Sequence, residues 1–161
     1  MPTPDQVRQL PELLRVQVPK EWEDLNGHVN VKHHLGMYDL TNDPLLEMLG
    51  ISEEWVRTGR VGIFDLEHHI WYLNEVHVGE EVALFVRITQ RNLKRVQGLV
   101  FLLNVSQEQL ASVIEFVSTA AHLDTRRTVP LPEPVTEGLD ALIHRQAALE
   151  WPAPRSGSLS I

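Results

Sequence analysis

The sequence contains no cysteine, which excludes disulfides, thiolate nucleophiles and zinc sites with cysteine ligands. No apolar run approaches the ~20 residues that a membrane-spanning helix needs, and no signal-peptide pattern opens the chain. The formal net charge of -8 argues against a nucleic-acid-binding surface, which needs a basic face. We therefore expect a cytoplasmic protein that binds neither nucleic acid nor a membrane.

The size and composition are those of one globular domain. The chain has 161 residues, of which 43% are hydrophobic and 22% are charged, as in ordinary globular proteins. We expect a single domain over residues 1–161, with the folded part at about 13–149. The first ten residues are polar and proline-marked, which indicates a loose arm. Residues 150–161 are rich in Pro, Gly and Ser, which predicts a flexible tail.

Hydrophobic periodicity predicts both strands and helices. Apolar residues alternate over 14–18 as in a strand, and they recur at three- and four-residue steps over 31–49 as on one face of a long helix. Because Pro44 lacks an N–H group, we expect a kink or restart of that helix near Asn42-Asp43. The remaining periods predict helices at 52–58 and 136–149 and strands within 61–76, 82–88, 95–105 and 110–123.

The order of these elements predicts an antiparallel sheet wrapped around one long central helix, which is an α+β architecture. Only the connection through the helix at 31–49 is long enough for a parallel crossover. The run Leu99 to Leu103 is apolar on both faces. This pattern predicts either a central strand or one that a partner covers, and we expect at least a homodimer.

A segment with the elements of acyl-transfer chemistry directly precedes the long helix: Asp24-Leu25-Asn26-Gly27-His28-Val29-Asn30. A helix N-terminus presents unpaired N–H groups and a partial positive charge. An aspartate beside them combines a base or nucleophile with an oxyanion site. The alternative interpretation of Asp24 is a loop or capping residue favoured by the helix dipole. Gly27 suits a turn, and Asn30 is a good helix N-cap.

This segment and the predicted architecture resemble the hotdog-fold acyl-CoA thioesterases of the 4-hydroxybenzoyl-CoA thioesterase type, over residues ~13–135. The family's signature is Asp-x-x-Gly-His-x-Asn at the mouth of the hotdog helix. Three further segments resemble a subgroup associated with carnitine breakdown and betainyl-CoA. They are Glu67–Glu75, Lys94–Val96 and His122–Asp124. The chain departs from this subgroup at His33-His34, where aromatics are expected, and at Gln97, where a histidine is expected.

The resemblance implies the roles of the main residues. Asp24 corresponds to the catalytic carboxylate, acting as nucleophile or as base on water, and Val31 supplies the backbone N–H that polarises the thioester carbonyl. No metal or redox cofactor is implied, since coenzyme A is part of the substrate. Family members are dimers joined edge to edge, often paired into tetramers, with active sites at the subunit interface.

Other candidates have two readings each. His28 either hydrogen-bonds Asp24 or is a structural histidine bonded to backbone. Glu67 is either a second catalytic carboxylate or a plain exposed one. Trp71 and Tyr72 point to opposite faces of a strand, so only one can line a given pocket. The expected substrate-binding residues are Asn26, Gly27, Asn30, Trp71, Tyr72, Lys94 and Arg95.

The histidines do not predict a metal site. His68 and His69 face opposite sides of a strand, and His33 and His34 lie ~100° apart on a helix. The sequence also argues against a serine hydrolase, because it has no Gly-x-Ser-x-Gly elbow.

The predicted function is hydrolysis of the thioester of a small, polar acyl-CoA, with betainyl-CoA as the candidate. The alternatives are an acyl-CoA hydratase or dehydratase on the same fold, and a non-catalytic acyl-CoA-binding protein.

Overall fold

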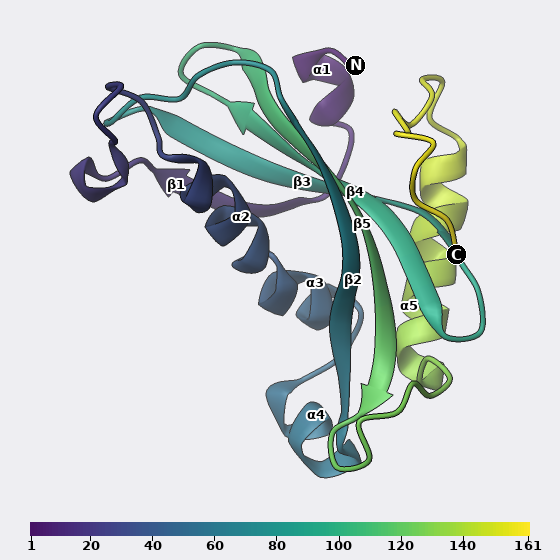
Figure 1. Ribbon diagram of the computed structural model, residues 1–161. Coiled ribbons are helices and arrows are strands. Elements are labelled where there is room, and N and C mark those ends of the chain that lie inside the picture. The colour runs from purple at the N-terminus through teal and green to yellow at the C-terminus, as the bar shows by residue number, and fades with distance from the viewer. The chain divides into compact units, whose positions relative to one another are not determined.

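Five strands form one sheet in the computed structural model, in the order β1-β3-β4-β5-β2. The model describes the backbone of residues 1–161 and every side chain except that of Glu53. The sheet is antiparallel, as predicted. Among the described residues, no helix combines the length and apolarity needed to cross a membrane. The elements are α1 (Pro4–Val7), β1 (Glu12–Gln17), a 3-10 turn (Lys20–Trp22), α2 (Val31–Asp39), α3 (Asn42–Met48), α4 (Glu53–Gly59), β2 (Val61–Tyr72), β3 (Glu81–Arg91), β4 (Arg95–Asn104), β5 (Gln109–His122) and α5 (Glu133–Ala147) (Figure 1).

The predicted long helix is divided into two short ones. α2 ends at Asp39, and α3 begins at Asn42. Pro44 is the third residue of α3, where its missing N–H costs no intrahelical bond. The restart expected near Asn42-Asp43 is therefore confirmed, and a pair of short helices replaces the single long one.

The chain divides into two compact units, which we describe separately. The first unit contains Met1–Pro44, Ile70–Val86 and Val100–Ile114. The second contains Leu45–His69, Arg87–Leu99 and Glu115–Ile161. The expected single domain over 1–161 stays a prediction.

In the first unit, α2 packs on the sheet through one buried face. His34, Met37 and Tyr38 are the buried residues of this helix, and they follow the three- and four-residue spacing of one helical stripe. The loop before α2 is fixed by two backbone bonds of 2.8 Å, from Val29 N to Val76 O and from Asn30 N to Trp22 O. The start of α2 is thus held in place from both sides.

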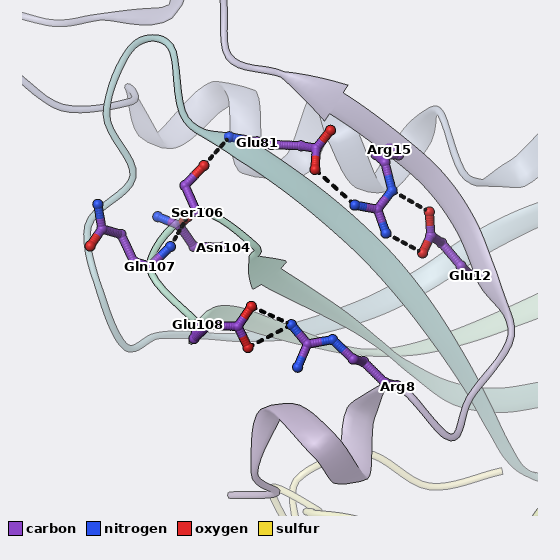
Figure 2. Close-up of polar contacts among 8 residues, drawn as sticks. All are labelled: Arg8, Glu12, Arg15, Glu81, Asn104, Ser106, Gln107 and Glu108. Atoms are coloured by element: carbon purple, nitrogen blue, oxygen red, sulfur yellow. Dashed lines mark hydrogen bonds and ion pairs between the residues drawn. The ribbon is translucent and has the colours of Figure 1, made fainter.

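The N-terminal arm is ordered, which corrects the expectation of a loose segment. Thr3 and Gln6 form a reciprocal capping box around α1, with a proline at the start of the helix. Val7 is fully buried. Arg8 donates to both carboxylate oxygens of Glu108 at 2.6 Å, which ties α1 to the turn between β4 and β5 (Figure 2). The folded part therefore begins well before residue 13.

In the second unit, α5 completes the edge of β3. Val135, Leu139 and Leu142 form its buried stripe. The pairing of β1 with β3 reaches only to Phe85, so the N–H groups of β3 beyond it need other acceptors. Gln146 Oε1 accepts from Ile88 N at 2.8 Å and supplies one.

The C-terminal segment also packs on the second unit, which corrects the prediction of a flexible tail over 150–161. Trp151 is buried. Its carbonyl accepts from Arg87 Nη1 at 2.9 Å, and its ring lies 4.2 Å from the Arg87 guanidinium carbon. Ser156 N donates to Glu115 Oε2 at 2.8 Å. Gln97 Nε2 also donates to Leu159 O at 3.4 Å. A ring contact and hydrogen bonds along its length thus anchor the segment.

The strand used to infer a partner is covered by the chain itself. The five residues Leu99 to Leu103 of β4 are at most 2% exposed. The first of the two expectations for this run, a central strand, is confirmed, and these residues therefore give no support to a dimer.

Candidate active site

The segment from Asp24 to Asn30 forms a closed loop ahead of α2. Glu23 and Val29 pair as an isolated antiparallel bridge, and Asp24 N donates to His28 O at 3.0 Å. Gly27 has φ of 84°, a left-handed conformation that glycine adopts without the steric cost of a Cβ. Gly27 thus supplies the turn, and Asn26 lies beside it; the substrate-binding roles expected of both stay predictions.

The Asp24 carboxylate is held at the base of this loop. Its side chain is 17% exposed, and Oδ1 lies 3.7 Å from His28 Nδ1. Oδ1 also accepts from Asn26 N at 2.8 Å. His28 Nδ1 lies 3.2 Å from Val29 O. His28 thus has a contact that fits each interpretation, one with Asp24 and one with the backbone, and the backbone contact is the shorter of the two.

The N-terminus of α2 leaves one donor open. Asn30 is the N-cap, as predicted: its Oδ1 accepts from Lys32 N at 3.2 Å, and its carbonyl accepts from His33 N at 2.9 Å. The N–H of Val31 has no acceptor among the described residues, as is usual for the first residue of a helix. This is the donor expected to face a thioester carbonyl.

A cavity of about 290 Å³ opens at this end of α2. It brings together three predicted site residues that come from the loop, the helix and β2. The lining residues are His28, Val29, Val31, His34, Tyr72, Leu73, Asn74, Glu75 and Val76. Asp24 lies in an adjoining hollow of about 440 Å³, lined also by Asn30 and His33. His28 lines the cavity and lies 3.7 Å from the Asp24 carboxylate, so it contacts both.

His34 is a cavity residue that sequence analysis missed. It is only 6% exposed, its Nδ1 lies 3.0 Å from Ser112 Oγ of β5, and its ring meets Tyr72 edge to face at 5.3 Å. Burial, with smaller contributions from the charges of His28 and His33, lowers the pKa of His34 to about 4. The ring is therefore neutral at pH 7. The available signal was its position three residues after Val31, on the same helix face.

The predicted residues of the Asp24–Asn30 loop other than His28 do not line the cavity, and neither do four predicted residues outside that loop. Glu67 is exposed on β2, and Lys94 and Arg95 are exposed at the turn from β3 to β4. Trp71 is half-buried beside Tyr72, and only Tyr72 lines the cavity. The roles proposed for these residues stay predictions. Among the described side chains, no three His, Asp or Glu gather as metal ligands would.

Comparison with known proteins decides the family. The family model of the thioesterase-like superfamily matches residues 18–139. The chain belongs to the thioesterase-like superfamily. The predicted family is therefore confirmed.

Relatives of this thioesterase-like protein include a betainyl-CoA thioesterase of Pseudomonas aeruginosa, 26% identical over 132 residues, or 82% of this chain and 83% of the relative. An L-carnitine dehydrogenase/betainyl-CoA thioesterase of Rhizobium sp is 26% identical over 142 residues, or 87% of this chain. The chain spans 28% of the length of that relative. A hypothetical protein from Staphylococcus aureus, solved in complex with CoA, superimposes with a TM-score of 0.80 at 22% identity, covering 94% of this chain and 95% of the other. Together with the family match, this similarity confirms the hotdog fold.

The neutral His34 of this thioesterase-like protein makes its stability depend on pH. Since the pKa is 6.5 for the ordinary group and about 4 in the fold, the unfolded chain binds a proton first. The contribution of His34 to the free energy of unfolding is fully present above pH 6.5, and it is lost as the pH falls towards 4. We expect this residue to lower the free energy of unfolding by roughly 3 kcal/mol over that range.

Chemical denaturation at several pH values measures this effect. His34→Gln should flatten the pH dependence relative to wild type, because glutamine does not titrate. The exposed His144→Gln is the control and should keep the wild-type slope. Equal slopes for wild type and His34→Gln would contradict the role assigned to His34.

Proposed function

We propose that the chain hydrolyses acyl-CoA thioesters, with the thioester carbonyl bound at the N-terminus of α2. The observation that carries this proposal is the N–H of Val31, a residue of the cavity, which has no acceptor among the described residues. His28 lines the same cavity, and its Nδ1 lies 3.7 Å from Asp24 Oδ1. Coenzyme A enters as part of the substrate, and no metal or redox cofactor is proposed. The lack of cysteine fits a reducing compartment, so the cytoplasm is the proposed location.

The proposed chemistry uses Val31 to stabilise developing charge. Its N–H donates to the carbonyl oxygen as that oxygen becomes negative, a contribution of about 3 kcal/mol for one such donor. Asp24 acts in one of two ways. It takes a proton from the water that attacks the carbonyl, or it attacks first and forms a mixed anhydride that water then hydrolyses. In both, the C–S bond breaks, the thiolate takes a proton, and the free acid and coenzyme A leave.

The cavity lining supports a small and cationic acyl group. Glu75 is the one carboxylate among the nine lining residues, and none of the nine is lysine or arginine. His34 adds no charge at neutral pH. Tyr72 offers an aromatic ring, and aromatic rings with a nearby carboxylate attract quaternary ammonium groups. Together with the betainyl-CoA thioesterase relatives, these features favour betainyl-CoA as the substrate.

Comparing the hydrolysis rates of different acyl-CoA thioesters tests which acyl group the protein prefers. When hydrolysis is measured by the release of free thiol, kcat/KM should be higher for betainyl-CoA than for acetyl-, hexanoyl- or palmitoyl-CoA. Tyr72→Ala should lower kcat/KM for betainyl-CoA several-fold, because Tyr72 is 52% exposed and a cation–π contact at an exposed site contributes about 0.5–1 kcal/mol. Acetyl-CoA should lose much less, since it carries no cation.

Trp71→Ala is the matched control, because Trp71 is adjacent in sequence but does not line the cavity. A preference for palmitoyl-CoA, or an equal loss of betainyl-CoA selectivity in Trp71→Ala, would reject this substrate assignment. Binding of coenzyme A thioesters without thiol release from any of them would instead favour the non-catalytic alternative.

A further inference from the structure

A second cavity, of about 260 Å³, lies in the second unit, where α5 and the C-terminal segment meet β3. Two of its eight lining residues are arginines, and none is acidic. They are Arg87, Ile88, Thr89, Ile143, Gln146, Ala147, Ala153 and Arg155. None of these residues lines the cavity at α2, so the two cavities are formed by different parts of the chain.

Arg87 is buried without a counter-charge. It is 8% exposed and stacks on Trp151 while donating from Nη1 to the Trp151 carbonyl. This carbonyl takes one of the five N–H donors of the guanidinium. The stacking fixes the plane of the guanidinium fork at the cavity wall. Anchoring of the C-terminal segment therefore uses only part of the hydrogen-bonding capacity of Arg87.

The other cavity arginine is also unpaired. Among the described residues, no Asp or Glu oxygen lies within 4.0 Å of the charged nitrogens of Arg87 or Arg155, whereas two other arginines of this unit have partners. Arg60 pairs with Asp124, and Arg91 with Asp140. Burial, and then the charge of Arg155, lower the pKa of the Arg87 guanidinium. Two repelling cations thus share a small cavity in a chain of net charge -8.

We propose that this cavity binds the phosphate group of a small phosphorylated molecule. A phosphate would offset both positive charges, and the forked donors of arginine match its oxygens. Binding sites that enclose whole ligands are usually ~300–1,000 Å³. A cavity of about 260 Å³ therefore holds the anionic group, with the rest of the molecule outside. The proposal does not rest on thioesterase activity, because the site shares no residue with the cavity at α2.

Titration with inorganic phosphate tests the site directly. Calorimetry at constant ionic strength, with chloride as the balancing anion, should detect binding to the wild-type protein. Arg155 is exposed and has no partner that a substitution would disrupt. Arg155→Gln should therefore keep the fold and weaken phosphate binding about tenfold. Arg155→Lys should bind with intermediate strength, because it keeps the charge but not the fork.

Arg57→Gln is the matched control, since it removes one exposed arginine of the same unit outside the cavity. It should bind phosphate as the wild type does. No phosphate binding by the wild type, or equal binding by Arg155→Gln and the wild type, would overturn the proposal. Neither result depends on turnover, so failure here and failure of the thioesterase proposal are separate outcomes.

Measurements of KM distinguish which molecule carries the bound phosphate group. If the site takes the 3′-phosphate of coenzyme A, Arg155→Gln should raise KM for an acyl-CoA but not for the acyl-dephospho-CoA. If it takes a separate phosphorylated molecule, KM should be unchanged for both thioesters while phosphate binding is still weakened. Both results support a phosphate site, and they differ only in the molecule that carries the phosphate.

Discussion

Asp24→Asn is expected to slow thioester hydrolysis by about a hundredfold or more while the protein stays folded. A general base or nucleophile contributes about 10²–10⁴-fold to a rate, and asparagine has neither the charge nor the basicity for either role. The substitution keeps the shape of the side chain, and its Oδ1 can still accept the 2.8 Å bond from Asn26 N. Steady-state kinetics and thermal unfolding of the same preparation measure both parts of this prediction.

Glu23→Gln is the matched control for Asp24→Asn. Glu23 is the preceding carboxylate, lines the same hollow, and forms an ion pair with Lys20. It should keep nearly the wild-type rate, because its charge is engaged with Lys20 and it does not contact His28. Wild-type turnover in a folded Asp24→Asn protein would assign the chemistry to another residue. A large loss in Glu23→Gln would mean that net charge in the loop, and not Asp24 itself, controls the rate.

Isotope labelling separates the two roles of Asp24. In a single turnover in H₂¹⁸O, attack by water places the label in the released acid, and the Asp24 carboxylate stays unlabelled. A mixed anhydride instead transfers an oxygen of Asp24 to the acid, so that hydrolysis at the Asp24 carbonyl places the label in the protein. Mass spectrometry of the peptide that contains Asp24 distinguishes the two.

The strands and helices were predictable because their signals are local. Extended apolar segments predicted strands within 95–105 and 110–123, and the structure has β4 at Arg95–Asn104 and β5 at Gln109–His122. The break between α2 and α3 followed from Pro44 alone. α1 carries an equally local signal, since Thr3 and Gln6 have the spacing of a capping box. The prolines around α1 were interpreted as signs of a loose arm, so the capping-box spacing was not used.

The features that sequence analysis missed depend on contacts between distant residues. Trp151 contacts Arg87, which is 64 residues away in the sequence. Hydrophobic periodicity is a local pattern and does not predict such a contact. His34 similarly meets Ser112 at a separation of 78 residues, and its low pKa comes from that burial. The substrate-binding or catalytic roles of Lys94, Arg95 and Glu67 were inferred from their charges and from the resemblance. Their placement depends on tertiary structure that the motifs do not encode.

The case for a dimer now rests on a different strand. β2 is the last strand in the sheet order, so one of its edges has no neighbour within the chain. It is 12 residues long, and Ile63, Phe64 and Leu66 are exposed on its two faces. A long exposed edge with apolar side chains is a template for pairing with another strand. A second copy of β2 meets this need, since two identical edges can pair antiparallel about a twofold axis.

We therefore expect light scattering to give a mass of twice the chain's 18.4 kDa, or a higher multiple if dimers pair again. Ile63→Lys combined with Leu66→Lys should shift the mass to that of one chain, because like charges and lost apolar contact oppose pairing of this edge. Leu93→Lys, at an exposed leucine in the turn between β3 and β4, is the control and should leave the mass unchanged. A wild-type mass of 18.4 kDa at micromolar concentration would rule out the dimer, and an unchanged oligomer in the double variant would place its interface away from β2.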